Sequence, residues 1–212
     1  MSEPSPLSAA AAPWDARLAR RLVWPLRGGP LTPNHLTTAR LAFGVAAAVA
    51  FMHGGYGYMN FGALLLVISN FLDHTDGELA RISGRSSALG HWYDLGSDAL
   101  VTVLLFAGIG AGVGVSSPSL LGCPPLLLGL LAGVAVAVIF YLRMRIEAVA
   151  GKVASRQASV GGFETEDVLY LLPLVMLCNG ARPFLVAAAV GGPLFAVWVA
   201  LDWHRVTHTL PR

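Results

Sequence analysis

Residues 73–98 read DHTDGELARISGRSSALGHWYDLGSD and hold four aspartates within a chain that is otherwise strongly apolar. Two sets of residues recur in this stretch at helical spacing: Asp73, Asp76 and Gly77, then Gly90, Asp94 and Asp98. Each set shares one face of a helix. The Ser- and Gly-rich residues 82–88 predict a short turn between the two helices. The spacing therefore predicts that two pairs of carboxylates face each other.

These carboxylates would repel one another unless cations lie between them. Oxygen-rich clusters suit hard ions such as Mg²⁺ or Mn²⁺. In the alternative, Arg81 and Arg85 pair with the carboxylates and hold the two helices together. Two arginines do not neutralise four aspartates and Glu78. We therefore favour a two-ion site, which can grip a pyrophosphate and stabilise both oxygens of an in-line displacement at phosphorus.

The composition is that of a membrane protein. Of the 212 residues, 55% are hydrophobic and 12% are charged, whereas soluble proteins carry about twice that charged fraction. The formal net charge is only +2 and no basic stripe runs through the chain, so no nucleic-acid partner is expected. Cys123 and Cys178 do not have the spacing of a metal site.

The apolar stretches predict an all-α integral membrane bundle of six transmembrane helices. Their expected ranges are 36–53, 58–82, 90–112, 126–147, 166–179 and 183–203. Residues 1–12, which lack the features of a signal peptide, are expected to form a disordered tail, and residues 13–212 a single domain.

Residues 13–28 place arginines among tryptophans and leucines. This pattern predicts an N-terminal amphipathic juxtamembrane helix on an anionic membrane surface, or alternatively an ordinary basic flank before the first span. All but Arg182 of the fourteen lysines and arginines fall on one side of the predicted spans. The positive-inside rule then places both termini and the aspartates at the cytoplasmic side of the cell inner membrane.

The stretch 73–98 resembles the signature of the CDP-alcohol phosphotransferase (CDP-alcohol phosphatidyltransferase) family, D-x2-D-G-x2-A-R-x8-G-x3-D-x3-D. Every specified position matches: Asp73, Asp76, Gly77, Ala80, Arg81, Gly90, Asp94 and Asp98. The resemblance implies that the hydroxyl of an acceptor alcohol attacks a CMP-linked alcohol and that CMP leaves. The expected donor is CDP-diacylglycerol and the acceptor a small polar alcohol. Alternatively, a CDP-linked choline, ethanolamine or inositol reacts with a lipid or polyol.

By position, the resemblance assigns the metal ligands to Asp73, Asp76 and Asp94, with Asp98 completing the set. Asp98 would also be the general base that takes the acceptor's proton. A carboxylate close to cations is a weak base, so Asp98 should be the least engaged with metal.

Four further motif residues receive roles in the same way. Gly77 and Ala80 would leave room for the nucleotide. Arg81 would contact the diphosphate with its fixed fork of donors. Gly90 would let the two helices come close.

The segment PNHLTTAR, residues 33–40, also resembles the family at the entry to the first span. Asn34, Thr37 and Arg40 recur at steps of three, so one helix face could contact the nucleotide. The alternative is helix capping by Asn34 or Thr37 and a basic membrane anchor at Arg40.

A basic patch follows the fourth span at Arg143, Arg145, Lys152 and Arg156. It could bind the phosphate of an acceptor, or equally serve as topological charge or as a lipid headgroup contact. We expect Glu78 to be a solvated partner of Arg81 or Arg85. His74 and His91 offer no tetrahedral zinc set and are expected to line the site or pack.

Membrane lipids are expected partners, with a groove between spans for a diacylglycerol moiety, and the resemblance suggests a homodimer. An alternative outside the enzymes is a cation transporter, which would have acidic residues midway across the membrane. It leaves Gly77, Ala80 and Arg81 unexplained.

Overall fold

The computed structural model describes residues 14–26, 28–84, 87–150 and 169–209. This part is helical throughout and contains no strand, apart from one isolated bridge between Leu120 and Cys123. Its elements in chain order are α2 (Trp14–Val23), the 3-10 turn η1 (Trp24–Leu26), α3 (Pro33–His53), α4 (Tyr56–Ser83), α5 (Ala88–Ser116), α6 (Pro125–Ala150), α7 (Leu172–Leu177) and α8 (Ala181–Thr209). The all-α prediction is confirmed.

Local sequence explains where the helices around the aspartates begin and end. Thr32 caps α3, because its hydroxyl accepts a hydrogen bond from the His35 amide and Pro33 follows at the first helical position. Asn34 and Thr37 are therefore not the cap that we considered. Helix α4 ends at Ser83 and is capped by Gly84, whose φ of 64° is left-handed. Ser87 then caps α5 by accepting from the Gly90 amide.

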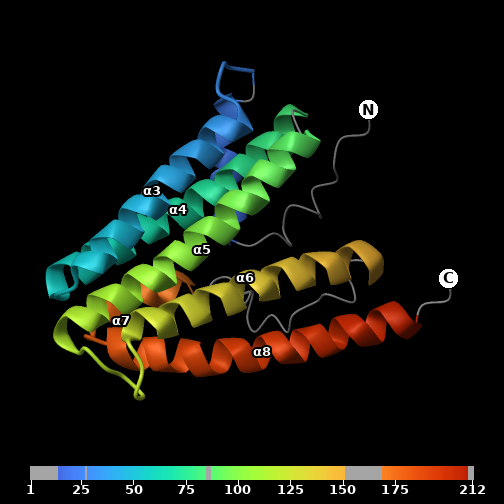
Figure 1. The fold of residues 1–212 in the computed structure, drawn as a ribbon. Coiled ribbons are helices and arrows are strands. Elements are labelled where there is room, and N and C mark those ends of the chain that lie inside the picture. Colours follow the sequence, from blue (N-terminus) through green and yellow to red (C-terminus); the bar gives the residue numbers. More distant parts are fainter. Residues whose placement is uncertain (1–13, 27, 85–86, 151–168, 210–212) are drawn as a thin grey trace.

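Helix α3 lies at the centre of the aspartate-bearing part. It packs along both α4 and α5, whereas α4 and α5 contact each other far less (Figure 1). Helix α6 packs against α5 and α8, and α2 packs against α4. The sequence predicted two helices whose carboxylates face each other; the structure adds that α3 packs against both of these helices.

Glycines allow the close approach of α3, α5 and α6. A Cβ atom on Gly108 of α5 would lie 2.5 Å from the carbonyl oxygen of Ala48 on α3. A Cβ on Gly112 would collide with the carbonyl oxygen of Phe51, and one on Gly129 of α6 with that of Phe106. Small residues of this kind let helix backbones touch where lipid provides no hydrophobic drive between helices.

Four helices of the described part are long and apolar enough to cross a membrane: α3, α5, α6 and α8. They support an integral membrane protein. Helix α4 has 28 residues but is not among the four, since polar side chains occupy both of its ends. The six-residue α7 is too short alone, at about 1.5 Å per residue, to span a hydrocarbon core of about 30 Å. Residues 166–168 of the predicted fifth span lie outside the described residues, so six spans remain a prediction.

The amphipathic helix predicted over residues 13–28 falls on α2, which is shorter than this range, and on the following turn η1. Ala19 and Val23 are buried, whereas Leu18, Leu22 and Trp24 are exposed. One face therefore packs against the protein, and an apolar stretch remains outside. Its location on a membrane surface stays a prediction, as do the disorder of residues 1–12, which lie outside the described part, and the single domain.

Candidate metal and nucleotide site

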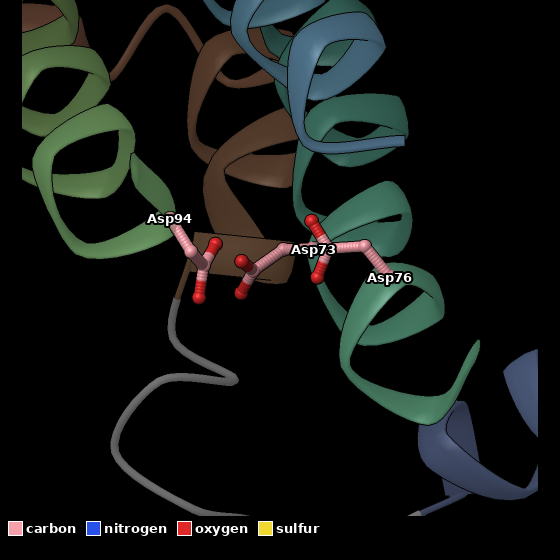
Figure 2. A group of neighbouring side chains, drawn as sticks. All are labelled: Asp73, Asp76 and Asp94. Atoms are coloured by element: carbon pink, nitrogen blue, oxygen red, sulfur yellow. The ribbon is translucent and has the colours of Figure 1, made fainter. Parts of the chain in front are cut away.

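Three of the four motif aspartates converge on one point. Asp73 and Asp76 lie one turn apart on α4, and Asp94 comes from α5. One ligand oxygen of each lies within 4.8 Å of the others (Figure 2). Asp76 is buried and the other two are half-buried. Three carboxylate oxygens at this separation suit a hard divalent cation such as Mg²⁺ or Mn²⁺.

Arg40 of α3 lies among these carboxylates. Its guanidinium forms an ion pair with Asp73, and Nη1 donates to Asp94 Oδ1 at 3.0 Å. Nη2 lies 3.6 Å from Asp98 Oδ1. The side chain is only 2% exposed, so the alternative that it is a basic membrane anchor is wrong. The sequence placed Arg40 on one helix face with Asn34 and Thr37, as a possible contact to the nucleotide, but did not predict its place among the aspartates.

Thr37 and Asn34 behave differently from each other. The Thr37 hydroxyl lies 2.7 Å from Asp76 Oδ2 and donates to it, so this buried side chain orients a carboxylate. Asn34 is exposed, and its amide oxygen faces Gly90. Both residues therefore stand beside the motif, as their shared helix face predicted.

Gly90 allows a close approach, but not the expected one. A Cβ atom there would lie 3.0 Å from Asn34 Oδ1 and 3.0 Å from Ser87 Oγ. The glycine thus makes room for the start of α3 and for the cap of its own helix. Around Gly77, by contrast, the nearest atom to a built Cβ is Arg81 Nη2 at 3.9 Å, so this face of α4 is open. Ala80 is half-buried nearby.

Arg81 and Glu78 form a pair at the end of α4. Arg81 Nη1 donates to Glu78 Oε1 at 2.6 Å, which confirms the predicted pairing. Glu78 is 8% exposed and Arg81 is 74% exposed, so Glu78 is buried where we expected it to be solvated. Arg85, the other arginine considered as a counter-charge, lies outside the described residues.

Two of the four predicted acceptor-binding residues lie in the described part of the chain. Arg143 and Arg145 of α6 lie over aromatic rings of α8, at 5.2 Å from the Phe195 centroid and 5.7 Å from the Trp203 centroid. Such cation–π contacts use the ring faces. Lys152 and Arg156 lie outside the described residues, so the basic patch stays a prediction.

The remaining ionisable residues of the motif do not join the cluster of three. Asp98 faces Arg40 from one turn beyond Asp94, and its engagement with a metal ion stays a prediction. The ring of His74 hydrogen bonds the Asn70 carbonyl and the ring of His91 lies against Trp92.

Together, the apolar helices and the inward-facing carboxylates define a membrane protein with a candidate divalent-cation site. The family model described as CDP-alcohol phosphatidyltransferase matches residues 30–203. The chain belongs to this family, which confirms the resemblance of residues 73–98. The transporter reading gains no support from this match.

Two relatives give the match more detail. The chain is 32% identical over 164 residues to the "Bifunctional IPC transferase and DIPP synthase" of Rubrobacter xylanophilus; this alignment covers 77% of the chain but only 35% of that protein. The fold is similar to that of Mycobacterium tuberculosis phosphatidylinositol phosphate synthase, solved with CDP-DAG bound. The TM-score is 0.54 at 24% identity, and 92% of each chain is covered, which shows a shared fold.

Proposed function

We propose that the protein transfers a phosphoalcohol group from a CDP-alcohol to the hydroxyl of a small polar acceptor, releasing CMP in phospholipid biosynthesis. The observation that carries the proposal is the convergence of Asp73, Asp76 and Asp94 within 4.8 Å. Family membership supports the reaction class. The acceptor oxygen would bond to the phosphorus that carries the donor alcohol, while the bond from this phosphorus to the CMP oxygen breaks.

The three converging aspartates would hold Mg²⁺ or Mn²⁺, with Asp98 at the edge of the set. Ions bound there would neutralise the diphosphate and stabilise the attacking and leaving oxygens. Asp98 would accept the proton of the acceptor hydroxyl. This role is supported by its place outside the cluster of three, because a carboxylate that does not ligate a cation is the stronger base.

The donor would lie along the open face of α4. At Gly77 the exposed Arg81 guanidinium is the nearest side-chain group to a built Cβ, at 3.9 Å, and the half-buried Ala80 continues this face. Arg81 is exposed and its contact with Glu78 uses one of its five donors, so it can turn the others toward a diphosphate. Asn34 would add a polar contact to the nucleotide, and Thr37 would act on it through Asp76.

The acceptor phosphate would be bound by the basic patch of Arg143, Arg145, Lys152 and Arg156. Arg143 and Arg145 lie over aromatic rings of α8, and guanidinium groups are well suited to donate to a phosphate. The same donors would suit a lipid headgroup. We further propose a homodimer in the inner membrane with the site facing the cytoplasm.

CDP-diacylglycerol is the preferred donor because the protein of similar fold was solved with CDP-DAG. The relative from Rubrobacter xylanophilus supports a second candidate, because its name, IPC transferase and DIPP synthase, does not mention a phosphatidyl group. In that case a CDP-linked small alcohol such as CDP-inositol would donate to a lipid or polyol.

The deciding experiment supplies purified protein with Mn²⁺, radiolabelled CDP-diacylglycerol and one acceptor at a time: glycerol phosphate, inositol phosphate, inositol or serine. We expect CMP release with one acceptor, and loss of that release on chelation. No release with any acceptor would exclude CDP-diacylglycerol transfer to these alcohols. CMP release from CDP-linked small alcohols would then establish the second candidate.

A further inference from the structure

Arg40 is the one fully buried arginine of the described residues, and its surroundings are unusual for a membrane helix. Moving an isolated charge out of water is costly unless partners compensate it. The partners here are Asp73, Asp94 and Asp98. One guanidinium therefore serves three carboxylates from two different helices.

The backbone of Arg40 is also held in place. The buried Ser69 hydroxyl of α4 donates to the Arg40 carbonyl oxygen at 3.0 Å. One turn later, Gly44 brings α3 against Val101 of α5 so closely that a Cβ would lie 2.6 Å from it. Contacts to both neighbouring helices thus fix the point from which the side chain reaches the carboxylates.

We infer that Arg40 is a built-in counter-cation and a positioning residue, which keeps the carboxylates of α4 and α5 assembled without a divalent ion. This deepens the proposed function, since it concerns the same site. The side-chain pairs of Arg40 use the Oδ1 atom of each of its three aspartates. The guanidinium thus holds the carboxylates by one oxygen, and the other oxygen of each can turn to an ion.

The charge balance supports this role. Four ionised motif aspartates and one arginine leave three negative charges uncompensated, which favours divalent ions without removing the need for Arg40 before they bind. The planar fork of arginine can reach several carboxylates at once, and the single ammonium of a lysine cannot do so equally well.

The test measures thermal unfolding of the purified full chain in detergent, with EDTA and with saturating Mn²⁺. For Arg40→Gln we expect the Tm in EDTA to fall by about 10 °C, since the clustered half-buried carboxylates would then repel one another with no counter-charge between them. Mn²⁺ should restore at least half of this loss because the ions then separate the carboxylates. Arg40→Lys should lose about half as much in EDTA. The exposed Arg182→Gln is the matched control and should not shift.

A second arm uses a double-mutant cycle in EDTA with Asp98→Asn. The variant Arg40→Gln/Asp98→Asn should melt above Arg40→Gln alone, because one repelling charge is gone. The inference is overturned if Arg40→Gln lowers the Tm equally in EDTA and Mn²⁺, which indicates packing alone, or if the double variant melts no higher. If Arg40→Gln does not fold, the same Tm comparison in EDTA is made between Arg40→Lys and the double variant Arg40→Lys/Asp98→Asn.

These readouts separate the inference from the proposed function. If the wild type released no CMP from any donor while the EDTA cycle behaved as expected, Arg40 would still be the counter-cation and the proposed reaction would be wrong. If CMP release were normal and the cycle showed no coupling, the reaction would stand and the role of Arg40 would fall.

Discussion

The two ends of the contact between α3 and α5 are built in opposite ways. At the polar end, Arg40 pairs with Asp94, and the Thr38 and Tyr93 hydroxyls hydrogen bond at 3.0 Å. At the apolar end, Gly108 leaves no room for a side chain against the backbone of Ala48. One end is joined by long polar side chains and the other by backbone in direct contact.

This difference separates stability from chemistry. Glycine contacts fix the helices at a single separation, because any added atom meets a rigid backbone. Side-chain ion pairs hold the carboxylates at distances that an ion or a diphosphate can enter. The apolar end of α3 thus fixes the position of the polar end. Substitutions at the apolar end should lower stability, and substitutions at the polar end should lower activity or ligand binding.

The largest effect is expected at the polar end from Asp98→Asn. Loss of a general base typically costs about 10²–10⁴-fold in rate, so CMP release should fall by about 10³-fold. Binding of the CDP-alcohol, measured with the labelled donor, should remain. Loss of donor binding together with turnover would show that Asp98 belongs to the donor site and is not the base.

At the apolar end, Gly108→Ala should lower the free energy of unfolding without changing the catalytic reaction itself. The new methyl group would stand 2.5 Å from the Ala48 carbonyl oxygen, and overpacking typically costs about 1–3 kcal/mol. The matched control is Gly96→Ala on the same helix, where a Cβ meets nothing within 4 Å. It should be neutral or stabilising by up to about 1 kcal/mol. Equal unfolding midpoints for the two variants would show that the close contact of Gly108 with α3 does not contribute to stability.

The neighbouring threonines Thr37 and Thr38 sharpen the comparison within the polar end. Thr37→Val removes the hydrogen bond to Asp76, and loss of a group that orients a metal ligand weakens metal binding about 10–100-fold. We expect about 10-fold weaker Mn²⁺ binding by calorimetry or electron paramagnetic resonance. Thr38→Val removes two exposed hydrogen bonds, to the Asn34 carbonyl oxygen and to the Tyr93 hydroxyl, and should change the affinity less than about 2-fold. A similar loss of Mn²⁺ affinity in both variants would show that Thr37 has no specific role in orienting Asp76.

The smallest effect is expected from Arg81→Lys. Arg81 is 74% exposed and lysine keeps the positive charge beside Glu78, so the unfolding midpoint should stay nearly the same. Affinity for the CDP-alcohol should fall by about 3–10-fold because the bidentate fork is lost. Unchanged affinity would remove Arg81 from the donor site.

The motif could be interpreted from sequence because its information is local. Helical periodicity alone places Asp73 beside Asp76, and the Ser- and Gly-rich turn returns the chain so that Asp94 can face them. The pairing of Arg81 with Glu78, three residues apart, was foreseen for the same reason. The burial of Glu78 was not, since it depends on which parts of the chain cover the end of α4.

The missed features all depend on residues distant in sequence. Arg40 precedes Asp73 by more than thirty residues, and nothing in its neighbourhood states that three carboxylates will surround it. Gly90 was expected to face α4 and faces Asn34 of α3. In both cases the sequence shows a residue capable of close contact, and the packing of α3 selects the partner.

By itself, the sequence determined an all-helical membrane protein of the CDP-alcohol phosphatidyltransferase family, with a carboxylate site at the ends of two consecutive helices. These conclusions follow from composition, the period of the α-helix and eight residues at fixed spacing. Only the tertiary structure decided that α3 joins the two halves and that Arg40 lies among the aspartates. The physical reason is that helical periodicity orients side chains over a few turns, whereas the choice of neighbouring helix is made by the shape and charge of surfaces far apart in the chain.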